Sequence, residues 1–105
     1  MNIQFSYLYR DAGNFKNFGE IIFANPNNFS LEDLRTRVKQ VLLGEMYFDA
    51  FAVGIPELFF EDYDEELDHD WHEFDRLDLV GLPLTDDQGR TIDDFFARLM
   101  AEKLK

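Results

Sequence analysis

A short acidic stretch with two histidines, FFEDYDEELDHDWHEFD at residues 59–75, contains the residue types best suited to bind a cation. If Asp62 is taken as the first position, acids fall at the positions that bind Ca²⁺ in an EF-hand loop. Leu67, however, stands where that loop needs glycine for its sharp turn. His69 and His72 are three residues apart and would share one side only in a helical turn, as a transition-metal site would require. The candidate ligands for a divalent metal ion are therefore Asp62, Asp64, Glu66, Asp68, His69 and His72.

The clustering of acids favours another interpretation, an acidic face that docks on a basic protein partner. Ten acids and a single base lie between Glu61 and Asp78, and the whole chain has a formal net charge of −12. Solubility alone would not require the charge to be so local. Aromatic residues among the acids would provide apolar contacts, unless they serve the core while the acids stay solvated. The candidate partner-binding residues are Asp62, Tyr63, Asp64, Glu66, Asp68 and Trp71, with Phe60 as a further aromatic contact.

Crowded carboxylates should also repel one another more strongly in the folded chain than in the unfolded one. We therefore expect stability to rise as the pH falls from 7 toward about 5. Neutralising Asp64, Glu66 and Asp68 together should stabilise the free protein and weaken its binding to a partner.

The composition argues against several other functions. The chain has no cysteine, which excludes disulfides, thiolate metal sites and a cysteine nucleophile. Its negative charge would repel nucleic acid and anionic membrane surfaces. No glycine-rich phosphate loop and no free serine nucleophile stand out, so an enzyme stays open only as the third hypothesis, after the protein-binding and metal-binding ones. No cofactor is expected apart from the metal ion of the alternative above. We expect a cytoplasmic protein, because MNIQFSYLYR lacks the features of a signal peptide and no apolar run approaches the length of a membrane span.

The elements that would position the acidic stretch follow from the periodicity of the apolar residues. Residues 2–9 alternate with period two, and GEIIFA at residues 19–24 is a second β-rich run, which predicts an antiparallel hairpin. Ser30 and Thr91 are suited to be helix N-caps and precede apolar residues at helical spacing. The two stripes comprise Leu31, Leu34, Val38, Val41 and Leu42 in the first helix and Ile92, Phe95, Phe96, Leu99 and Met100 in the second.

The remaining segments are less regular. Phe15 and Phe18 in the hairpin loop are expected to fold back onto the sheet edge, although exposed they would form a contact site. Residues 45–60 are interrupted by Gly54 and Pro56, so we expect a loop there and a short strand near residues 57–60.

The segment at residues 71–80 completes the predicted order β-β-α-(β)-β-α. Phe74 lies on one parity and Leu77 and Leu79 lie on the other, which predicts a strand with a β-bulge. Two amphipathic helices need an apolar surface to cover, and a small antiparallel sheet supplies one. The sequence therefore predicts a single α+β domain over residues 1–105, a two-layer sandwich with three to four strands under two helices. Strand order and oligomeric state do not follow from the sequence.

Two stretches, LYRDAGNFKNFGE near the start and DYDEELDHDWHEF later in the chain, together resemble a small family of uncharacterised bacterial proteins. The resemblance covers most of the chain and implies no activity, cofactor or site.

Overall fold

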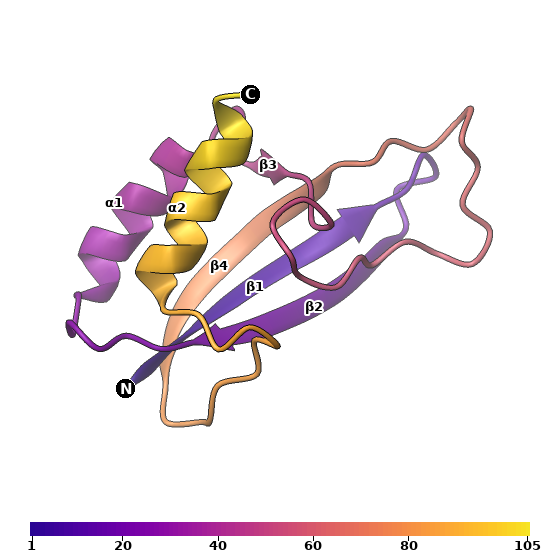
Figure 1. The fold of residues 1–105 in the computed structure, drawn as a ribbon. Coiled ribbons are helices and arrows are strands. Elements are labelled where there is room, and N and C mark those ends of the chain that lie inside the picture. The colour runs from indigo at the N-terminus through magenta and orange to yellow at the C-terminus, as the bar shows by residue number, and fades with distance from the viewer.

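In the computed structural model of residues 1–105, four strands form one antiparallel sheet and two helices lie side by side over one of its faces (Figure 1). The strands are β1 (Asn2–Arg10), β2 (Lys16–Phe23), β3 (Tyr47–Phe48) and β4 (His72–Val80), and the helices are α1 (Leu31–Val41) and α2 (Ile92–Lys103). The sheet order is β2-β1-β4-β3, so β1 lies between the two other long strands. The predicted α+β class is confirmed.

The core lies between the helices and the sheet because β1 alternates its side chains between the two faces. Its helix-facing side chains, Ile3, Phe5, Tyr7 and Tyr9, are all buried. Phe5 meets Phe95 of α2 edge-on, with 5.0 Å between the ring centroids. The helices contribute the predicted stripes, of which Leu31 and Met100 are only partly buried.

Both helices begin at the predicted N-caps. The hydroxyl of Ser30 accepts a hydrogen bond from the backbone N–H of Asp33 at 3.1 Å. Thr91 accepts one from the backbone N–H of Asp94, whose carboxylate accepts one from the N–H of Thr91 in return, which completes a capping box. Neither helix is long and apolar enough to cross a membrane.

The predicted bulge is present in β4. Ser6 pairs with Arg76, but the next residue of β1, Tyr7, pairs with Phe74, so Asp75 is the extra residue. The bulge shifts the parity by one position and returns Phe74 to the side of the sheet that the helices cover.

The prediction of a short strand at residues 57–60 is wrong. That segment is irregular, and the short strand is β3, where Tyr47 pairs with Glu73 and Phe48 with His72. Pro56 just before the segment offers no backbone N–H for a ladder, and the chain there lies over the sheet, where the carbonyl of Pro56 accepts a hydrogen bond from the hydroxyl of Tyr7 at 2.6 Å.

Phe15 and Phe18 do not fold back as predicted, since they are 69% and 62% exposed. The register of the hairpin explains Phe18. It lies opposite Leu8 on the face of the sheet that the helices leave open, whereas its neighbour Gly19 lies opposite the core residue Tyr7. Alternation along β2 therefore directs Phe18 away from the core.

Candidate functional site

The acidic stretch forms a turn-rich loop between β3 and β4 that reaches past the end of the sheet, beside the β1–β2 turn (Figure 1). We call residues 61–71 the acidic loop. Asp68 ties it to that turn, because its carboxylate accepts hydrogen bonds from the backbone N–H of Ala12 at 2.8 Å and of Asp64 at 2.9 Å. The bonds from Asp64 and Ala12 lower the pKa of Asp68. Asp68 is therefore a support of the loop, which argues against the expectation that neutralising Asp64, Glu66 and Asp68 together would stabilise the free protein.

Two tyrosine hydroxyls fix the carboxyl end of the acidic loop. The hydroxyl of Tyr9 donates to the carbonyl of His69 at 2.7 Å, and that of Tyr63 donates to the carboxylate of Asp70. Burial raises the pKa of Tyr9 to about 12, and the hydrogen bond with Asp70 raises the pKa of Tyr63 to about 12. Both phenols are therefore protonated donors at neutral pH.

Most acids of the loop point into solvent. Five of the ten acids between residues 61 and 78 have partners within the chain. Asp68 and Asp70 accept the hydrogen bonds described above, and Asp64 accepts one from the backbone N–H of Glu66. Glu73 forms an ion pair with Arg10, and Asp78 forms one with Arg76. No lysine or arginine lies in the acidic loop itself. Its exposed acids are Glu61, Asp62, Asp64, Glu65, Glu66 and Asp70.

The candidate metal ligands do not converge. No group of three or more His, Asp or Glu side chains in the chain is positioned to hold a metal ion. His69 is exposed, and its Nδ1 accepts a hydrogen bond from the backbone N–H of Trp71. His72 lies in extended backbone at the start of β4 and is fully buried, so the two histidines do not form a pair. The metal alternative therefore lacks the geometry that it requires.

His72 instead belongs to the aromatic part of the core. Its ring centroid lies 5.2 Å from that of Tyr9 and 5.1 Å from that of Phe59, and its Nε2 accepts a hydrogen bond from the backbone N–H of Leu58 at 2.9 Å. Its Nδ1 is buried without a hydrogen-bond partner. Burial lowers the pKa of His72. The imidazole is therefore neutral at pH 7, with its proton on Nδ1 because Nε2 is an acceptor.

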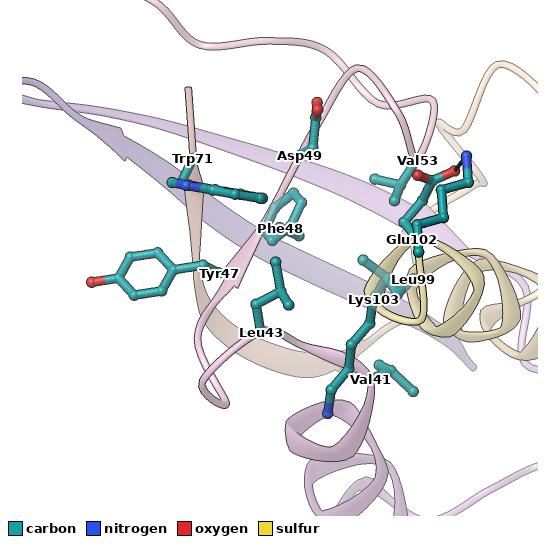
Figure 2. A pocket seen from close by; sticks show the side chains of 11 residues that line it. Val41, Leu43, Tyr47, Phe48, Asp49, Val53, Trp71, Leu99, Glu102 and Lys103 are labelled. Atoms are coloured by element: carbon teal, nitrogen blue, oxygen red, sulfur yellow. Dashed lines mark hydrogen bonds and ion pairs between the residues drawn. The ribbon is translucent and has the colours of Figure 1, made fainter. Parts of the chain in front are cut away.

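Trp71, at the end of the acidic loop, lines a cavity of about 120 Å³ beside β3 (Figure 2). Apolar side chains from α1, β3 and α2 line the interior, and Tyr47 and Trp71 lie together on one side of it. Lys103 lies at the rim, where its Nζ donates to the carbonyl of Gln40 at 2.7 Å. The rim also contains Glu102, which forms ion pairs with Arg98 and Lys105. Lys103 and Glu102 therefore already have partners within the chain, and neither offers a free charge to a ligand in the cavity.

The structure divides the predicted partner-binding residues into groups. Asp62, Asp64 and Glu66 lie together on the exposed loop. The ring of Tyr63 packs on Phe59, and Phe60 is also partly buried beside Tyr9, so both serve the loop's packing as well as its surface.

The sequence did not lead us to Leu67 as an apolar contact residue, although it is 72% exposed in the middle of the acids. A single apolar residue within a polar run was the available signal. The candidate site rests on the geometry of this chain, because the sequence matches no protein-family model and no curated protein, and the fold matches no solved structure.

Proposed function

We propose that this chain is a protein-binding module whose acidic loop docks on a basic segment of a protein partner. The observation that supports this most is the set of six exposed carboxylates on a loop that hydrogen bonds fix to the sheet. Because the loop is ordered before binding, it would lose less conformational entropy on association than a flexible acidic tail would.

The surface offers apolar contacts as well as charge. Leu67 is exposed among the acids, and Phe15 is exposed in the β1–β2 turn, which the hydrogen bond from Ala12 to Asp68 keeps beside the loop. A segment that alternates Lys or Arg with apolar residues would satisfy both features. Nucleic acid would not, because its phosphates would be repelled by the same carboxylates.

A binding titration with paired variants tests the proposal. The probe is a fluorescent peptide of alternating lysine and leucine, and the readout is its anisotropy at low and moderate salt. Asp62, Glu65 and Glu66 are exposed and their side chains make no hydrogen bond within the chain, so D62N/E65Q/E66Q should leave the fold intact. Surface ion pairs contribute about 0.2–1 kcal/mol each, so this variant should bind roughly threefold to a hundredfold more weakly at low salt.

The matched control is E32Q/E45Q/D87N, which removes the same charge from exposed positions outside the loop. It should bind nearly as well as the parent. Equal weakening in both variants would mean that the peptide responds to net charge alone, and no binding by the parent at low salt would contradict the proposal.

A further inference from the structure

We propose that the free edge of β2 pairs with the same edge of a second copy of the chain, forming a two-fold symmetric dimer with one continuous sheet. β2 is an edge strand of the sheet, and unpaired edge strands readily pair with another chain. The opposite edge of the sheet is less regular, because β3 pairs with β4 over only two residues and β4 itself has a bulge at Asp75.

The backbone of β2 shows which groups face outward. The N–H of Ile22 donates to the hydroxyl of Thr85 at 2.8 Å, and the N–H of Thr85 donates to the carbonyl of Ile22 at 3.1 Å. The groups of Ile22 therefore point away from β1, and alternation directs those of Glu20 and Phe18 the same way. No hydrogen bond from a loop or side chain of the chain reaches the N–H or C=O of either residue. The segment from Lys16 to Glu20 is thus open for pairing.

This segment is complementary to itself in the antiparallel direction. With Phe18 opposite Phe18 of the partner subunit, Lys16 lies opposite Glu20 of the partner subunit, and the same pair recurs on the other side of the axis. Within the chain, Lys16 lies opposite Arg10 and Glu20 lies opposite Ser6, and neither Lys16 nor Glu20 forms an ion pair. The dimer would give each unpaired charge an opposite partner.

The same register would cover an exposed ring. Lys16, Phe18 and Glu20 alternate with residues that face the helices, so all of them lie on the open face. Phe18 lies there beside a shallow hollow that Ser6, Asp75 and Arg76 also line. Two Phe18 rings would meet as a cross-strand aromatic pair at the two-fold axis.

The arrangement also separates the acidic loops. Each loop lies at the hairpin end of its own sheet, next to Ala12. Antiparallel pairing of the two β2 strands directs these ends away from each other. The largest concentrations of negative charge would therefore lie at opposite ends of the dimer.

Sedimentation of the purified chain at concentrations up to about 1 mM tests this. The expected result is a reversible dimer in moderate salt. K16E and E20K should each weaken association about fourfold or more, because attractive cross-strand pairs become repulsive. The double variant K16E/E20K restores opposite charges and should dimerise like the parent. Circular dichroism melts would verify that the variants fold.

E20K distinguishes specific pairing from general repulsion, because it reduces the net negative charge and would strengthen a dimer limited by repulsion alone. Phe18→Pro provides a second variant. It removes an outward N–H that β1 does not use, so it should abolish the dimer while the monomer stays folded. A parent that stays monomeric throughout, or a double variant no better than the single ones, would overturn the proposal.

Discussion

Acidification from pH 7 to about pH 5.5 should destabilise the protein because of His72. Burial lowers the pKa of this imidazole below its ordinary value of 6.5, while the backbone of Asp70 and the carboxylate of Asp49 raise it and the exposed His69 lowers it further. Below that ordinary value the unfolded chain takes up a proton that the folded chain does not yet accept. The stability that the neutral imidazole contributes is therefore complete above pH 6.5 and is lost as the pH falls toward the folded pKa.

The loss of stability on acidification has an upper limit, because His72 can take up only one proton. Even a folded imidazole that took up no proton over this range would lose only about 1.3 kcal/mol of stability between pH 7 and 5.5, because the unfolded chain, with its ordinary pKa of 6.5, takes up less than one proton there. For a domain of this size, that free energy corresponds to a decrease in Tm of roughly 5–10 °C. Repulsion among the exposed carboxylates predicts the opposite, a stability that rises over the same range.

Thermal melts of the parent and two variants, followed by circular dichroism, separate these effects. The chain has two histidines, so each can be replaced in turn. H72Q retains an acceptor for the N–H of Leu58 but does not titrate, and it should lose the dependence on pH. H69Q should keep it. A parent whose Tm is constant or rises on acidification, or an H72Q variant with an unchanged slope, would refute the reasoning.

Three further predictions concern the supports of the fold. Asp68→Asn should lower Tm at pH 7, because an amide presents one acceptor oxygen to the two N–H groups that the carboxylate now binds; the difference should shrink in acid, where the carboxylate itself protonates. Leu34→Ala and Leu99→Ala should each cost about 2–5 kcal/mol in chemical denaturation, since both side chains are fully packed between the helices and the sheet. Arg90→Ala should cost about 3–5 kcal/mol in the same assay, because the buried carboxylate of Asp86 loses the guanidinium now bound at 2.9 Å and keeps only backbone hydrogen bonds, such as the one from the N–H of residue 90.

The parts of the fold that depend on neighbouring residues were predictable from the sequence. Ser30 and Thr91 form their caps with residues three positions along, and the apolar stripes act within a few turns. The bulge was also predictable, because one extra residue changes the parity of the strand in a way that the apolar pattern records.

The parts that depend on distant residues were not predictable. Asp68 binds the backbone of Ala12, 56 positions away, and nothing near it in the sequence distinguishes it from Asp64 or Asp70. His72 is buried because β4 places it among rings of other segments, whereas its acidic neighbours suggested a surface position. β3 has two residues, fewer than any periodicity needs.

The most direct test of the acidic loop as a binding surface is to map a bound peptide by NMR. The lysine-leucine peptide would be titrated into ¹⁵N-labelled protein, and the backbone amide shifts would be followed residue by residue. We predict that the shifts concentrate in residues 61–71 and in the β1–β2 turn around Phe15, and that they diminish as salt is added. Shifts concentrated at the cavity beside Trp71, or spread evenly over the surface, would contradict the account.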